Sequence, residues 1–243
     1  MGRKVHPVGF RLGQYRLWDS HWYADRDYSA QVVEDSKIRD FVRKWLLNPP
    51  GSEDRRRGGR KSFSAGVSRI EIRRASHLVR VTVHTSRPGI VIGRGGSNRD
   101  ALQAAMSKEF KKRVALNVAE ISTAELDAYL VARNVADQLE RRVSFRRAMK
   151  MSAERTMRAW AEGVKIMVSG RLGGREMART EFEVRGRVPL STMRADIDFG
   201  QATAFTSYGA IGVKAWVHRG EKSDNKDSSG SDEESNVPQG VER

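Results

Sequence analysis

Residues 88–97 read Pro-Gly-Ile-Val-Ile-Gly-Arg-Gly-Gly-Ser, which predicts a short apolar turn, a glycine loop and the start of a helix. Gly93 and Gly96 frame a G-x-x-G pattern, with Arg94 and Gly95 between them. Because glycines lack Cβ atoms, main-chain N–H groups in such a loop can approach phosphates closely, and the arginine adds a positive charge. The stretch therefore favours contact with a nucleic-acid backbone. The alternative is a plain glycine-rich turn.

The same glycines complete neither of two common nucleotide-binding motifs. A Walker-type phosphate loop ends in Gly-Lys-Ser or Gly-Lys-Thr, whereas this loop ends in Gly-Gly-Ser and has no lysine. The dinucleotide fingerprint G-x-G-x-x-G would begin at Gly93, but Asn98 occupies the position of its third glycine. We therefore expect no ATP site and no cofactor.

The overall composition points to a globular protein that binds a polyanion. The 243 residues are 38% hydrophobic, which is enough for one large or two modest cores, and the formal net charge is +15. Nucleic acid is the leading partner for such a charge. A membrane partner is not expected, because no apolar run approaches the roughly 20 residues that span a bilayer. The N-terminal residues resemble neither a signal peptide nor a myristoylation site, so we expect a cytoplasmic protein.

Metal and thiol chemistry are disfavoured by residue type and spacing. The chain contains no cysteine, which removes disulfides, thiolate metal sites and cysteine nucleophiles. Its five histidines have no pair at the spacing used by zinc hydrolases: His6, His21, His77, His84 and His218. We expect no metal site and no catalytic residue.

The N-terminal half alternates between basic segments and periodic ones. Residues 1–17 look like an extended basic arm, and the Arg-rich stretch 48–64 has too few apolar residues to pack, so we expect a flexible loop there. The pattern predicts a helix over 28–47, strands over 67–72 and 78–85, a helix capped by Ser97 or Asn98 that reaches Phe110, and a strand over 114–121.

A cationic ridge marks the helix-rich segment 125–162. Arg142, Arg146 and Lys150 recur at four-residue spacing, which would align them on one helix face, with Arg141 and Arg147 flanking them. Acidic residues are nearly absent there until Glu154, so the ridge should repel itself unless a polyanion neutralises it. The pattern favours RNA contact over a plain solvated face.

Residues 164–220 alternate as short strands, which predicts a small sheet packed on helices. The turn at 170–175 is expected to present Arg171 and Arg175 to RNA phosphates. Five aromatic residues of this segment either stack on bases or pack in the sheet core: Phe182, Phe199, Phe205, Tyr208 and Trp216. From Glu221 the chain is rich in Ser, Asp, Glu and Asn, and we expect it to be disordered.

These elements follow the order of a type II KH domain, αββααβ. Residues 84–96 resemble the KH loop of the third protein family of the bacterial small ribosomal subunit, and the similarity covers roughly residues 1–47 and 66–220. Further segments that resemble that family are 4–13, 139–150, 168–180 and 186–198. The loop at 48–64 and the acidic tail depart from the family's compact pattern.

The resemblance implies an α+β fold with two domains. An N-terminal type II KH domain, residues 18–121 with the inserted loop 48–64, would follow the basic arm 1–17. A C-terminal α/β sandwich-like domain with a small, mostly antiparallel sheet would span 122–220, and an acidic tail would occupy 221–243.

The resemblance also implies a non-catalytic RNA-binding role in the small ribosomal subunit. The KH loop residues Gly93, Arg94, Gly95 and Gly96 would bind RNA. Family positions that match Arg146, Arg147 and Lys150, with Arg142 beside them, lie at the messenger RNA entry, where they help the ribosome open structured messenger. Ribosomal RNA would contact residues of the arm and of the 170–175 turn: Arg3, Lys4, His6, Arg11, Arg171 and Arg175. Expected protein neighbours belong to the tenth and fourteenth families in the head and to the fourth and fifth at the entry channel.

Two other functions stay open from the residues alone. A free KH regulator of RNA would explain the loop but gives no reason for a C-terminal sheet domain. A metal-dependent nuclease or lyase could use Asp196 and Asp198, although no third ligand is visible and a structural role is favoured.

Overall fold

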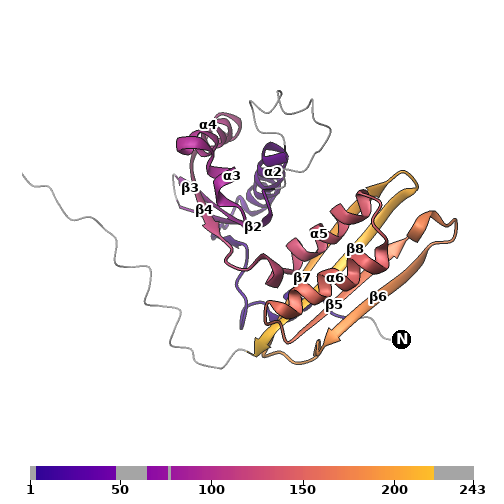
Figure 1. The fold of residues 1–243 in the computed structure, drawn as a ribbon. Coiled ribbons are helices and arrows are strands. Elements are labelled where there is room, and N and C mark those ends of the chain that lie inside the picture. The colour runs from indigo at the N-terminus through magenta and orange to yellow at the C-terminus, as the bar shows by residue number, and fades with distance from the viewer. Residues whose placement is uncertain (1–3, 48–64, 76–77, 222–243) are drawn as a thin grey trace, which may run out of the picture.

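The computed structural model describes residues 4–47, 65–75 and 78–221. In this part of the chain two four-stranded sheets each carry two long helices on one face, and the first sheet is followed in sequence by the second (Figure 1). Each sheet has its own cluster of buried apolar side chains. None of the helices described is long and apolar enough to cross a membrane.

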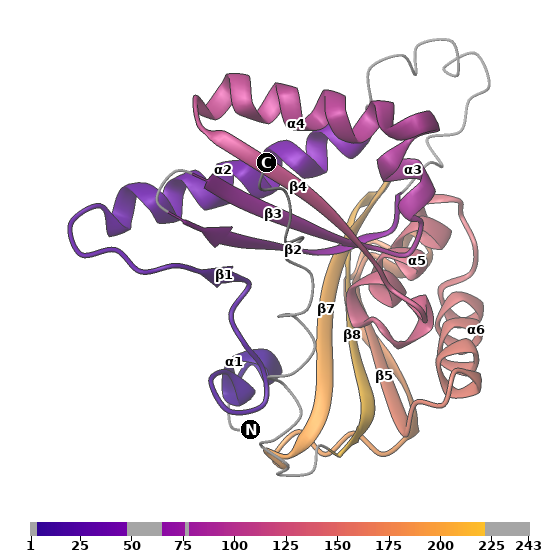
Figure 2. The ribbon, with the colours of Figure 1, turned by 90° about the vertical axis from the view of Figure 1, so that its left-hand side faces the viewer.

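The first sheet has the strand order β1-β2-β3-β4. Its strands are β1 (Ser20–His21), β2 (Val67–Arg74), β3 (Leu78–Thr85) and β4 (Arg113–Glu120). β2 and β3 are antiparallel, whereas β4 runs parallel to β3. Helices α2 (Tyr28–Leu47) and α4 (Ser97–Phe110) cover one face, and the short helix α3 (Pro88–Ile92) connects β3 to the glycine loop (Figure 2). This is the predicted αββααβ order with β1 added.

Side-chain alternation explains why this sheet forms. Val79, Val81 and Val83 lie on one face of β3 and are buried. They pack against apolar residues that recur along the inner face of α2, such as Ile38 and Val42.

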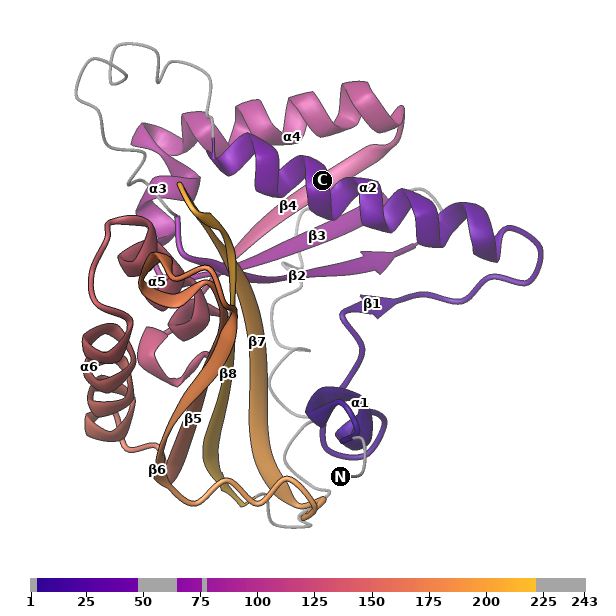
Figure 3. The same cartoon turned by 90° about the vertical axis from the view of Figure 1, so that its right-hand side faces the viewer.

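The second sheet is antiparallel throughout and has the order β6-β5-β8-β7. Its strands are β5 (Gly163–Gly170), β6 (Arg179–Gly186), β7 (Ala195–Thr206) and β8 (Gly209–Glu221). Helices α5 (Ala128–Glu140) and α6 (Phe145–Arg158) pack on one face. The N-terminal helix α1 (Pro7–Arg11) lies on the opposite face beside β7 (Figure 3).

Polar contacts join the two halves where α5 begins. Asp127 caps α5 by accepting a hydrogen bond from Leu130 N at 3.0 Å, and its other carboxylate oxygen accepts one from Ser68 Oγ of β2. Arg219 Nε of β8 donates to Leu126 O at 2.9 Å. The start of α5 is therefore attached to both sheets.

Several expectations need correction. The arm expected to be extended forms α1 over five of its residues. The helix-rich segment 125–162 is two α-helices, separated at residues 141–144. The strands β7 and β8, of 12 and 13 residues, are longer than the alternation suggested, because they continue together into one long hairpin. Glu221, expected to begin the disordered tail, is instead the last residue of β8. Expectations for residues 48–64 and for 222–243 fall outside the residues described.

Candidate nucleic-acid interface

The G-x-x-G loop has a backbone that requires its glycines. Gly93, Gly95 and Gly96 all have positive φ, at 75°, 59° and 86°, and the last two belong to a 3₁₀ turn, η2 (Arg94–Gly96). A Cβ on Gly93 would also lie 2.6 Å from Asn98 Cγ. Arg94, between the glycines, is exposed. The loop therefore holds an open backbone beside an exposed cation.

The first turn of α4 lacks a side-chain cap. Gly96 is the N-cap, so the predicted cap at Ser97 or Asn98 is wrong. Asn98 instead donates through Nδ2 to Ile90 O at 3.2 Å, which ties α4 to α3. The Ser97 N–H donates to Arg94 O, and no side chain caps this turn, so the positive end of the helix can still favour a nearby anion.

The cationic ridge is interrupted between α5 and α6. Arg142 has φ 62°, in the left-handed region, and it lies two residues beyond the end of α5 at Glu140. Arg142 therefore does not share a helix face with Arg146 and Lys150, and the prediction of one continuous helical ridge is wrong. Ser144 is the N-cap of α6, so the helical row starts afresh after it.

Within α6, Arg146, Arg147 and Lys150 remain together on the exposed side. The opposite side is buried, with Ala148 and Met149 at 0% and 3% exposure, so the helix is held firmly against the sheet. In the described part of the chain Arg147 and Lys150 form no ion pair. We call Arg146, Arg147 and Lys150 the α6 row.

Arg146 differs from its neighbours because it has local partners. Its Nε lies 3.7 Å from Glu181 Oε2 on β6, and its guanidinium lies 5.6 Å from the centre of the Phe145 ring. Arg179 approaches the same ring and also pairs with Glu181, at 2.9 Å. Sequence reasoning missed Glu181, because nothing in a linear pattern shows which strand lies beside the start of α6.

The N-terminal residues expected to bind ribosomal RNA fall into different environments. Arg11 is 2% exposed, and its guanidinium donates to backbone carbonyls at Pro7, Ala195 and Thr192 at 2.6–2.9 Å. Arg11 thus holds α1 on the sheet, and its charge does not reach the surface. Lys4 and His6 are exposed, whereas Arg3 lies outside the residues described.

One of the two arginines of the 170–175 turn forms hydrogen bonds within the protein. Arg171 donates to Arg175 O at 3.0 Å and to Tyr208 O at 3.2 Å, which joins this turn to the β7–β8 hairpin. Arg175 is exposed. The two arginines expected to act alike therefore differ, and Arg175 is the one available to a phosphate.

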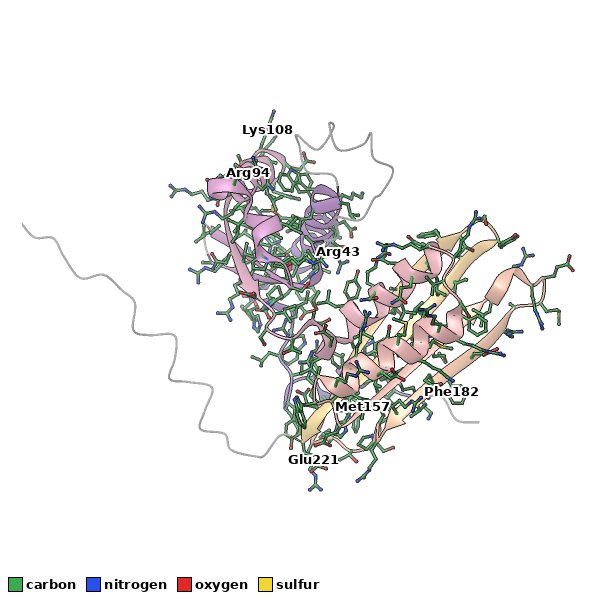
Figure 4. The ribbon with its side chains drawn as sticks, in the orientation of Figure 1. Arg43, Arg94, Lys108, Met157, Phe182 and Glu221 are labelled. Atoms are coloured by element: carbon green, nitrogen blue, oxygen red, sulfur yellow. The ribbon has the colours of Figure 1, made fainter. Side chains whose placement is uncertain are left out.

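The aromatic residues of the second sheet do not form its core. Phe182, Phe205 and Tyr208 are exposed, and Phe199 and Trp216 are half-buried. On the face without α5 and α6, Lys165 Nζ lies 5.6 Å from the Phe182 ring centre and 5.4 Å from that of Trp216. The core instead consists of small and aliphatic residues. Figure 4 shows Phe182 at the edge of this sheet, well apart from Arg94 on the other half.

Asp198 is a structural node, and its environment does not suit a metal ion. Its carboxylate accepts hydrogen bonds from Arg16 at 2.7 Å, Arg219 at 3.0 Å and the backbone N–H of Ala128 at 3.0 Å. Burial alone would raise the pKa of Asp198, but Arg219, Arg16 and these hydrogen bonds lower it overall. Among the described residues no group of three or more acidic or histidine side chains could hold a metal ion. The described residues therefore offer no metal site at Asp196 and Asp198 for the nuclease or lyase alternative.

Comparison with known proteins gives two matching family models. Residues 60–126 match the KH domain, and residues 135–217 match the C-terminal domain of ribosomal protein S3. The chain is 51% identical over 221 residues to the small ribosomal subunit protein uS3 of Syntrophomonas wolfei, a match that covers 91% of this chain and 90% of the relative. It is equally similar to the uS3 proteins of Listeria welshimeri and Listeria monocytogenes, with 94% of each relative covered. The chain therefore belongs to the uS3 family of small ribosomal subunit proteins, which are ribosomal structural proteins and not enzymes.

Proposed function

We propose that this protein binds small-subunit ribosomal RNA in the head of the subunit and lines the entry through which messenger RNA reaches the ribosome. The observation that carries the proposal is the α6 row. It presents three neighbouring cations on the exposed side of a helix whose other side is buried. Such a row attracts a phosphate backbone and loses little entropy on binding, because the helix is already fixed.

The row would act by position and charge alone. As messenger RNA is pulled past it, the cations would hold a backbone and keep two strands of a hairpin apart. No nucleotide hydrolysis by this protein is needed, since the translating ribosome supplies the movement. Arg142, although it lies off the α6 face, is exposed in the preceding turn and would extend the same positive surface.

Ribosomal RNA contacts are assigned to different residues. The open loop Gly93–Gly96 with Arg94 would hold one RNA segment, and the exposed residues Lys4, His6 and Arg175 would contact others. We expect Arg3 to join Lys4 on sequence grounds. Arg11 and Arg171 support these surfaces from within the protein. Protein neighbours of the tenth, fourteenth, fourth and fifth families remain part of the proposal.

The proposal is tested by sedimentation of a cell lysate at high salt. Because weak electrostatic contacts are lost as salt rises, only an integrated component should stay with the small subunit. We expect co-migration at close to one copy per subunit. A largely free pool of the protein would instead support a free KH regulator.

A further inference from the structure

A groove of about 460 Å³ lies between the first sheet and helices α5 and α6. Its walls come from two regions that are distant in sequence. Arg87 enters from the segment after β3, Arg133 and Arg141 from α5 and the turn after it, and Arg155 from α6. Arginines therefore line the groove from both halves of the molecule.

The charge on these walls is unevenly compensated. The groove contains two carboxylates, Glu125 and Asp137, against four arginines. Arg133 is neutralised locally, because its Nε lies 2.8 Å from Asp137 Oδ1. Arg87 and Arg155 are exposed and form no ion pair within the ranges that the structure describes. The groove thus keeps a positive charge that is available to an external anion.

The walls are held in place before any ligand arrives. The backbone N–H of Arg87 donates to Thr85 Oγ1 at 3.1 Å, and that hydroxyl in turn donates to Ala65 O. Across the junction, the hydrogen bond between Ser68 and Asp127 fixes the start of α5 against β2. The backbone at Arg87 and the start of α5 are therefore fixed before any ligand binds, which lowers the entropic cost of binding.

We propose that this groove binds the phosphate backbone of one RNA segment that contacts both halves of the protein. The inference rests on the proposed function only in that the chain binds RNA. Arg87 directly precedes α3, which leads to the G-x-x-G loop, and Arg141 lies in the turn between α5 and the α6 row. The groove would join these two surfaces, and guanidinium groups suit phosphate because they donate two parallel hydrogen bonds.

The binding test compares two double variants of the full-length chain. Arg87→Gln with Arg155→Gln removes the two unpaired groove cations, and Arg113→Gln with Arg158→Gln removes two exposed arginines outside the groove. The probe is in vitro transcribed small-subunit ribosomal RNA, titrated at several salt concentrations. For two lost phosphate contacts the slope of log K against log salt should become shallower by about 1.4, at about 0.7 per contact. The control should keep a steeper slope than the groove variant.

The outcomes separate this inference from the function on which it rests. If the wild-type protein does not bind the RNA, the proposed function fails. If the wild type binds and the groove variant has the same slope as the control variant, the groove proposal is overturned while the function stands. Equal melting temperatures of the two variants ensure that the comparison concerns binding.

A second experiment identifies which RNA occupies the groove. Since the chain has no cysteine, Asn134→Cys creates a unique attachment point for an iron chelate at the exposed lip of the groove. In small subunits assembled with this protein and loaded with messenger RNA, hydroxyl radicals should cut the RNA nearest to that lip. Cleavage of ribosomal RNA or of the messenger supports the groove and names its source. No cleavage of either RNA overturns the proposal.

Discussion

Replacing Asp198 with asparagine removes a buried charge at which three segments of the chain meet. Arg16 from the N-terminal segment, Arg219 from β8 and the first N–H of α5 at Ala128 all donate to this carboxylate. Asp198 is 6% exposed, and asparagine would keep one acceptor oxygen but lose the charge and put an NH2 donor in place of the other oxygen. Arg16 and Arg219 are 26% and 38% exposed, so water can solvate them after the change, and we expect a loss of about 2 kcal/mol for Asp198→Asn, as for hydrogen bonds to a charged group.

The assay is equilibrium unfolding in urea, followed by circular dichroism. Asp100→Asn is the control, because its pair with Arg99 is exposed and should contribute less than about 1 kcal/mol. The pKa of Asp198 is lowered in the folded state, so its contribution is present above the unfolded pKa, near 4, and is lost as pH falls through the folded value. The wild type should therefore lose more stability on acidification than Asp198→Asn. If Asp198→Asn lowered the free energy of unfolding by less than about 1 kcal/mol at neutral pH, as the control does, the proposed structural role of Asp198 would be refuted.

Three further outcomes follow from other parts of the molecule. A Cβ on Gly200 of β7 would overlap the backbone at Tyr129 of α5, so Gly200→Ala should lower the free energy of unfolding by about 3 kcal/mol, measured in urea. An unchanged free energy of unfolding would show that α5 does not pack directly on that strand. Burial and Arg69 lower the pKa of His84 in the folded state. The protein should therefore lose stability as pH drops below the pKa of histidine in the unfolded chain, near 6.5. Melting curves recorded over a series of pH values should show that His84→Gln abolishes this dependence. Deletion of residues 222–243, which are rich in polar and acidic residues, should leave the melting temperature unchanged by calorimetry, whereas a large fall would mean that the tail packs.

Local sequence patterns predicted the helices and strands well, because the spacing of apolar residues along an element is set by neighbouring positions in the chain. The apolar period from Tyr28 to Leu47 and the stop at two prolines gave the bounds of α2, and valine alternation gave β3. The G-x-x-G loop was likewise predictable, since glycine is the residue that tolerates its positive φ values.

Features that depend on distant segments could not be read from the sequence. Arg11 looked like any other basic residue of an arm, but its burial depends on carbonyls near residue 195, more than 180 positions away. The break at Arg142 was hidden because the spacing of cations continues across it, although the backbone does not. Glu181, which partners Arg146, became visible only when β6 was placed beside α6.

The most direct test of the account is translation through a stable messenger hairpin by ribosomes that carry Arg146→Ala, Arg147→Ala and Lys150→Ala together. A matched control replaces three exposed cations of α2 with alanine: Lys37, Arg43 and Lys44. We predict normal assembly, slower passage through the hairpin and an unchanged rate on unstructured messenger for the α6 variant alone. Equal slowing on both messengers, or equal slowing by the control, would contradict a role for the α6 row at the messenger entry.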